Sequence, residues 1–272
     1  MANSKLTSAK KAKNDEFYTQ YYDIQKEIDA YIEYNPDVFQ GKTILLPCDD
    51  PEWSNFTKFF AQKFKKLGLK KLISTSYAVD SKNYKSGYQP TLFETSDSQY
   101  DKDKTTKNGK IFTLTQDKTG DGKVNVDDLE WHYLEGSGDF RSGEIKKLRD
   151  EADIIITNPP FSLFRKFLAW IMEAGKQFVI IGNLSAITYK EVFPLIKNNK
   201  MWHGKGFNAG NAYFSTPFAK DYAEGVYNPE TGLVKFRNCC WFTNLDHGRR
   251  HQFLPLILWV SVSRYLRLTA RR

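Results

Sequence analysis

A short apolar run that stops at two prolines most constrains how this chain folds. Residues 153–157 read Asp-Ile-Ile-Ile-Thr, and such a β-branched run is typical of a strand buried on both faces. Residues 158–161 read Asn-Pro-Pro-Phe, and two prolines cannot continue a strand ladder. Apolar side chains at helical spacing follow from Ser162 to Gly175, which predicts a helix. We therefore expect the tetrapeptide at the carboxyl end of a parallel strand, where open α/β sheets bind ligands.

The tetrapeptide has the chemistry to activate an amino group on a planar ring. Such a nitrogen is a poor nucleophile because its lone pair is delocalised into the ring. The Asn158 side-chain oxygen and the Pro159 carbonyl can each accept one of its N–H bonds, which frees the lone pair. Pro160 stiffens the turn, and Phe161 offers a ring on which a base flipped out of a duplex can stack. The alternative is a plain strand-to-helix loop with an Asn cap, but this sequence in this context favours the amino-group site.

A second strand-to-helix unit places acidic residues at the same edge of the predicted sheet. Residues 43–47 are expected to form a strand, and residues 53–67 a helix with Trp53 in its buried stripe. Between them lie Pro47, Cys48, Asp49 and Asp50. A phosphate site would favour glycines and free backbone N–H groups, so two carboxylates favour a cationic or hydroxyl-bearing ligand. Ordinary helix-capping acids are the alternative.

The remaining elements alternate between strands and helices. Further strands are expected at 71–78, 111–115 and 178–181, a short helix at 127–134, and a helix opened by a capping box of Thr188 and Glu191. Residues 212–214 and 235–243 are expected to supply the last strands of the same sheet. This order predicts an α/β fold with a mostly parallel, doubly wound sheet and an antiparallel strand near the C-terminal end.

Composition divides the chain into segments. We expect a disordered basic tail at 1–13, one domain at 14–251, a surface insertion at 80–110 that is poor in aliphatic residues, and an atypical tail at 252–272. Residues 117–128 resemble a calcium loop in spacing. A strand rather than a helix is expected before them, which favours a glycine-rich turn over a calcium site.

Charge and cysteine content narrow the partners. The net charge of +8 and the pI near 9.1 favour a polyanionic partner. Three cysteines supply neither a disulfide framework nor zinc spacing, which favours the cytoplasm, and we expect no metal at the site. The N-terminus lacks the apolar core of a signal peptide, and the apolar run at 253–262 is too short to span a bilayer. We expect a monomer without membrane contact.

Taken together, five stretches resemble the EcoRI-type adenine-specific DNA methyltransferases, which use S-adenosylmethionine and have a Rossmann-like fold. The likeness runs from about Asp15 to His251. Its motifs are residues 15–19 (Asp-Glu-Phe-Tyr-Thr), 46–51 (Leu-Pro-Cys-Asp-Asp-Pro), 138–142 (Gly-Asp-Phe-Arg-Ser), 158–161, and 206–214.

The resemblance implies a role for each motif. Phe17, Tyr18 and Thr19 border the methionine part of the cofactor, and residues 47–50 replace the usual glycine-rich loop. Asp139 accepts the amino hydrogens of the cofactor adenine, with Phe140 beside the ring. Asn158, Pro159, Pro160 and Phe161 hold the flipped adenine of double-stranded DNA. The sequence shows no clear acidic residue at the end of the second strand to bind the ribose of the cofactor, and Asp80 is the candidate.

The sequence leaves two other functions open. An Asn-Pro-Pro-aromatic site can hold any planar amino group, so cytosine N4, RNA or a protein glutamine are alternative acceptors. The atypical end of the chain also allows a truncated DNA-binding remnant without catalysis.

Overall fold

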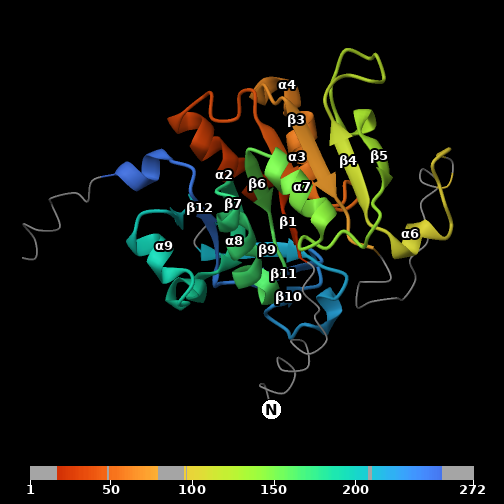
Figure 1. Ribbon diagram of the computed structural model, residues 1–272. Coiled ribbons are helices and arrows are strands. Elements are labelled where there is room, and N and C mark those ends of the chain that lie inside the picture. The colour runs from red at the N-terminus through yellow and green to blue at the C-terminus, as the bar shows by residue number, and fades with distance from the viewer. Residues whose placement is uncertain (1–16, 48, 79–94, 96, 208–209, 253–272) are drawn as a thin grey trace, which may run out of the picture.

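The computed structural model describes residues 17–47, 49–78, 95, 97–207 and 210–252 (Figure 1). A sheet of eight strands runs through its centre. In spatial order the strands are β5 (Glu130–Tyr133), β4 (Lys110–Leu114), β3 (Lys71–Thr75), β2 (Thr43–Leu46), β6 (Ile154–Thr157), β7 (Gln177–Asn183), β12 (Cys239–Thr243) and β8 (Trp202–His203).

The middle of this sheet is parallel and both of its edges are antiparallel. Strands β3, β2, β6 and β7 run in the same direction. On one side β4 and β5 pair antiparallel, and on the other β12 and β8 do so. The expected mixed α/β fold and the antiparallel strand near the C-terminal end are confirmed. The antiparallel pair formed by β4 and β5 was not anticipated.

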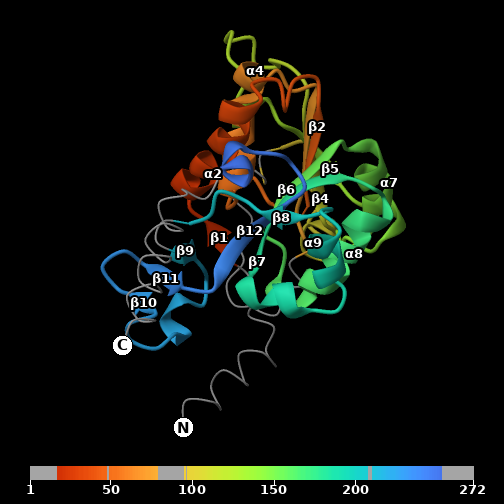
Figure 2. The same ribbon diagram turned by 90° about the vertical axis from the view of Figure 1, so that its left-hand side faces the viewer.

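Helices cover both faces of the sheet (Figure 2). One face carries α2 (Tyr21–Tyr34), α3 (Asn55–Gln62) and α4 (Phe64–Leu67), and the other carries α7 (Gly143–Glu151), α8 (Phe164–Glu173) and α9 (Phe193–Lys197). Neighbouring strand residues point to opposite faces, so Ile44 and Ile156 join one core while Leu45 and Ile155 join the other. This two-sided burial is why the middle strands are continuous apolar runs.

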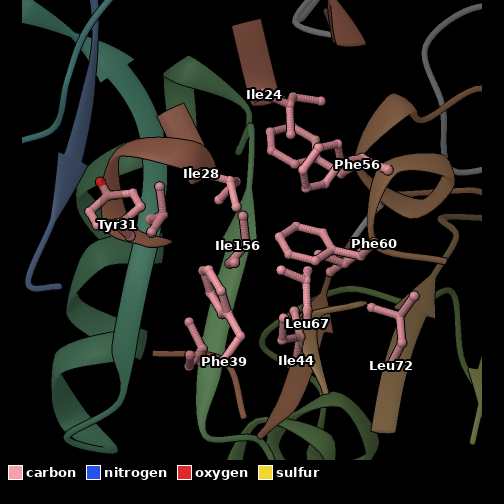
Figure 3. Close-up of a cluster of buried hydrophobic side chains, with 14 of the residues drawn as sticks. Ile24, Ile28, Tyr31, Phe39, Ile44, Phe56, Phe60, Leu67, Leu72 and Ile156 are labelled. Carbon is pink, nitrogen blue, oxygen red and sulfur yellow. The ribbon is translucent and has the colours of Figure 1, made fainter. Parts of the chain in front are cut away.

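The first core is built from aliphatic and aromatic side chains between α2, α3 and the sheet. Figure 3 shows Ile24 and Ile28 of α2 beside Phe56 and Phe60 of α3, with Ile156 of the sheet among them. All five are at most 2% exposed. Full burial of a side chain of this size stabilises the fold by about 1.5–3 kcal/mol.

A second, smaller sheet lies beyond the central one, below it in Figure 1. It is antiparallel, and its order is β1 (Tyr18–Thr19), β9 (Ala212–Ser215), β11 (Leu233–Phe236) and β10 (Tyr227–Asn228). The expectation that 212–214 and 235–243 extend one sheet is therefore wrong. Only β12 joins the central sheet, because β9 pairs with β1 and β11 instead.

Three predicted helices differ from the structure. The Ser54 hydroxyl accepts the N–H of Phe56, so α3 begins at Asn55, and Trp53 is 53% exposed instead of buried. The predicted helix at 53–67 is also divided at Lys63, which lies between α3 and α4.

Residues 127–134 are not helical either. They hold the end of a 3₁₀ turn, η2 (Val126–Asp128), and strand β5. Residues 130–133 form a strand because they pair with β4, and their side chains alternate in exposure as a strand at the edge of a sheet requires.

The capping box of Thr188 and Glu191 does not form. Asn183 caps the 3₁₀-helix η4 (Leu184–Thr188), and α9 starts later, with Pro194 in its first turn, where the missing N–H costs nothing. The described part of the chain also contains the 3₁₀-helices η3 (Phe161–Leu163), η6 (Ala219–Asp221) and η7 (Gly248–His251).

Several sequence predictions concern residues outside the described ranges. These are the tail at 1–13, most of the insertion at 80–110, Cys48, Asp80, and the tail at 252–272 beyond Gln252. The described end of the insertion carries the short helix α6 (Lys104–Lys107). None of the helices in the described ranges is long and apolar enough to cross a membrane.

Candidate active site

The candidate site lies where the parallel strands end. The register aligns β2 with β3 and β6 with β7, so the segments after Leu46, Thr75, Thr157 and Asn183 leave the sheet at one edge. This edge therefore collects Pro47, Asp49, Asp50 and residues 158–161, as the sequence predicted. The short strand β1 is tied to the same edge by a hydrogen bond from the Asn158 side chain, 2.8 Å from its Nδ2 to the Phe17 carbonyl.

That hydrogen bond fixes how the Asn158 amide is oriented. Because the nitrogen faces a carbonyl, the oxygen Oδ1 must point the other way. Oδ1 is buried and has no hydrogen-bond partner among the described residues. A buried acceptor without a donor costs about 1–3 kcal/mol, so this atom is suited to a ligand that brings an N–H group.

Phe161 is anchored by other aromatic rings. Its ring is stacked on that of Phe17, with centroids 5.6 Å apart and planes inclined by 23°. Phe214 of β9 meets it edge-on at 6.3 Å, and Phe236 of β11 meets Phe17 edge-on at 5.1 Å. The small sheet is thus connected to the tetrapeptide through Phe17. The turn itself is held by the N–H of Leu163, which donates to the Pro160 carbonyl at 2.9 Å, while Pro159 is buried.

Thr19 is the second residue of β1 and is almost fully buried. Its carbonyl accepts the side-chain N–H of Asn55 at 2.8 Å, which ties β1 to the start of α3. Its hydroxyl oxygen has no hydrogen-bond partner within the described ranges. Tyr18, between Phe17 and Thr19, stacks on Trp53 with ring centroids 6.4 Å apart. The motif at 17–19 thus presents an unused polar atom at the edge where β2 and β6 end.

Asp49 belongs to the loop between β2 and α3 and is only 7% exposed. One carboxylate oxygen accepts the hydroxyl of Ser54 at 2.7 Å, and the other accepts that of Thr157 at 2.6 Å. The backbone carbonyl of Asp49 accepts the hydroxyls of Thr57 and Ser74. Burial raises the pKa of Asp49 to about 7, although the hydrogen bonds from Thr157 and Ser54 act in the opposite direction. The residue therefore links α3, β3 and β6.

The neighbours of Asp49 differ in their surroundings. The Thr157 hydroxyl also lies 3.1 Å from the Pro47 carbonyl, so its single proton is shared between that carbonyl and the Asp49 carboxylate. Asp50 is half-buried, and its carboxylate accepts the N–H of Glu52 at 2.9 Å.

Asp139 follows a glycine that lies tightly against the end of β3. Gly138 has a φ of +82°, and a Cβ there would lie 2.3 Å from the Ser76 carbonyl, so only glycine fits. The Arg141 side chain hydrogen-bonds the Asp139 carboxylate, with Nε 2.8 Å away, and this holds the pKa of Asp139 below its usual value. The loop thus presents a charged carboxylate beside the strand next to β2.

Phe140 lies beneath this charged pair, with the Arg141 guanidinium over its ring at 5.6 Å from the centroid. Its ring is 4% exposed and packs edge-on against Phe167 and Trp170 of α8, at 5.1 and 5.7 Å. The structure thus places Phe140 in the second core, beneath the loop that carries Asp139.

The two hydroxyl residues that donate to the buried Asp49 carboxylate were not predicted from the sequence. Ser54 had a readable signal, because serine before an apolar helix is a common N-cap. Thr157 had none, since a threonine in a β-branched strand gives no sign that its hydroxyl is used.

Comparison with known proteins gives a family. The sequence profile described as "Adenine-specific methyltransferase EcoRI" matches residues 5–267. The chain is 40% identical over 257 residues to the Type II methyltransferase M.EcoRI of Escherichia coli, covering 93% of this chain and 72% of that protein. It is 32% identical over 250 residues to the Type II methyltransferase M.MpnI of Mycoplasma pneumoniae, covering 90% and 66%. No solved structure gave a significant match.

Proposed function

The chain belongs to the EcoRI family of adenine-specific methyltransferases, and we propose that it methylates the N6 amino group of adenine in double-stranded DNA. The methyl donor is S-adenosylmethionine, and the setting is a restriction-modification system or the protection of phage DNA. We assign the catalytic unit to residues 14–251 as one Rossmann-like methyltransferase domain. A flipped-out adenine is required, because the amino group is not accessible for this chemistry inside a duplex.

The observation that carries this proposal is the buried, unpartnered Oδ1 of Asn158. The Phe17 carbonyl holds the amide nitrogen, which leaves Oδ1 free to accept one N–H of the adenine amino group. The Pro159 carbonyl accepts the other N–H, Pro160 keeps the turn rigid, and Phe161 stacks on the base. The freed lone pair would take the methyl group as the methyl–sulfur bond breaks and its electron pair returns to sulfur, leaving a neutral thioether, and the nitrogen would then lose its extra proton to solvent. No strong base is needed for this order of events.

The cofactor site consists of the other segments at the same edge. S-adenosylmethionine supplies a methyl group bound to a positively charged sulfur. Phe17, Tyr18 and Thr19 border its methionine part, and the unpartnered hydroxyl of Thr19 fits a polar ligand. Pro47 and Asp50, on either side of the buried Asp49, form the neighbouring wall. Asp139 accepts the adenine amino hydrogens, and Phe140 supports this loop from the core.

Methyl transfer to unmethylated genomic DNA with radiolabelled S-adenosylmethionine tests the proposal. We expect label in N6-methyladenine after digestion to nucleosides, and one sequence context when the methylated sites are mapped. The Asn158→Ala variant should lose about two orders of magnitude in single-turnover rate, comparable to removal of one polarising contact, and should still bind the cofactor.

Other products would contradict the assignment. Label in N4-methylcytosine, RNA or protein would show a different acceptor. Cofactor binding without any transfer would identify a non-catalytic protein. Near-wild-type rates in Asn158→Ala would refute the mechanism.

A further inference from the structure

We propose that Asp49 and Thr157 form a positioning pair that fixes Asn158 for methyl transfer without touching either substrate. This inference rests on the proposed function. It gives the buried carboxylate a role distinct from that of a direct cofactor ligand.

Both carboxylate oxygens of Asp49 accept a hydrogen bond from within the protein. Ser54 donates to Oδ1 and Thr157 donates to Oδ2, both at hydrogen-bonding distance, and the side chain is almost completely buried. Burial of a carboxylate is costly unless its oxygens receive hydrogen bonds. The two hydroxyls offset part of that cost, so the group is suited to holding protein elements together.

Thr157 connects the buried Asp49 carboxylate to the proposed reaction. It is the last residue of β6 and directly precedes Asn158. The ladder between β2 and β6 pairs Ile44 with Ile154 and Leu45 with Ile155, two residues before Thr157. Beyond that point the Thr157 hydroxyl connects the two strand ends, by its bonds to Asp49 and to the Pro47 carbonyl.

Asn158 is therefore held from two sides. Its side-chain nitrogen donates to the Phe17 carbonyl, and the preceding residue, Thr157, hydrogen-bonds Asp49. Catalytic groups must be held to within a fraction of an ångström, and such precision comes from supporting hydrogen bonds behind them. Loss of the Thr157 hydroxyl would let the end of β6 shift and would move Oδ1 away from the target amino group.

Two substitutions at position 157 separate positioning from packing. Thr157→Val keeps the shape and removes the hydroxyl, whereas Thr157→Ser keeps the hydroxyl and removes a methyl group. We expect single-turnover methyl transfer to slow about tenfold or more in Thr157→Val and to stay within about threefold of wild type in Thr157→Ser. Affinity for S-adenosylmethionine, measured by calorimetry, should change less than about threefold in both.

A control at the other carboxylate oxygen completes the experiment. Ser54→Ala removes the second donor to Asp49 and the cap of α3, so it should lower the melting temperature and slow transfer less than Thr157→Val does, because Ser54 is not adjacent to Asn158. Asp49→Asn combined with Thr157→Val should be no slower than the slower of the two single variants, because the two residues act as one unit.

The outcomes distinguish this inference from the proposed function. If wild-type protein transfers no methyl group to DNA, the function is wrong. If wild type is active and Thr157→Val is equally fast, or if Thr157→Ser is as slow as Thr157→Val, the positioning pair is refuted while the function stands. Weakened cofactor affinity in Thr157→Val with an unchanged transfer rate would also refute it, by placing the pair on the cofactor side.

Discussion

The buried carboxylate of Asp49 should make the stability of the protein depend on pH in a defined direction. Burial raises the pKa of Asp49 from 3.8 to about 7, so the folded state keeps a proton that the unfolded chain has lost. The contribution to stability is complete below the unfolded pKa and is lost as the pH rises through the folded pKa. A shift of about 3 units corresponds to a free energy on the order of 4 kcal/mol.

The Asp49→Asn variant isolates this contribution because asparagine cannot ionise. The free energy of unfolding of wild type should fall by about 3 kcal/mol through Asp49 between pH near 5 and pH near 8, whereas the variant should not show this loss. For a chain of this size that difference corresponds to about 5–10 °C in melting temperature. Other carboxyls with shifted pKa values, such as the buried Glu27, are present in both proteins and cancel in the comparison.

Thermal and urea unfolding of both proteins at the two pH values measures the effect. A constant difference between wild type and variant would refute the reasoning, because it would show that Asp49 does not titrate in this range.

Three further predictions concern ligands. Asp139→Ala should weaken S-adenosylmethionine binding roughly ten- to a hundredfold, the loss of one hydrogen bond to a charged acceptor, and an unchanged calorimetric affinity would remove Asp139 from the site. DNA affinity should fall steeply with salt because the net charge is +8, with a log–log slope of several negative units, and a flat dependence would argue against duplex DNA. Residues 117–128 should not bind calcium tightly, because strand β4 precedes them and the carboxylates of Asp117 and Asp128 already accept backbone N–H groups. Titration that gives sub-micromolar calcium affinity would contradict this.

The sequence was most informative where a segment's structure depends on its own residues. Strands β2, β3, β6 and β7 were located because a strand covered on both faces must be an apolar run. Strand β5 lies within residues 127–134, which were predicted as a short helix. Its partner β4 lies across a turn and determines its conformation, which local propensity cannot anticipate.

In the candidate site, too, local features could be predicted from the sequence and long-range contacts could not. The position of Asn158 at a strand end follows from the prolines after it, so it could be predicted. Its hydrogen bond to the Phe17 carbonyl joins residues 141 positions apart, and no spacing rule reaches that far. Asp49 shows a third case, because an acid after a strand can face a ligand or the protein interior. Only the positions of Ser54 and Thr157 decide that it faces inwards.

The stacked rings of Phe17 and Phe161 lead to a final prediction. Because Phe17 covers one side of Phe161, a base that stacks on Phe161 must use its other side, and Phe17 then fixes the plane of the stacking ring. Stacking of a base on an aromatic side chain contributes about 1–3 kcal/mol, and part of this depends on a ring that is held still. Phe17→Ala should therefore lower kcat/KM for DNA about tenfold, whereas Phe17→Tyr, which keeps the ring, should stay near wild type. Faster methylation by Phe17→Ala would show the opposite, that the Phe17 ring occupies the place of the base and must move away before the base can bind.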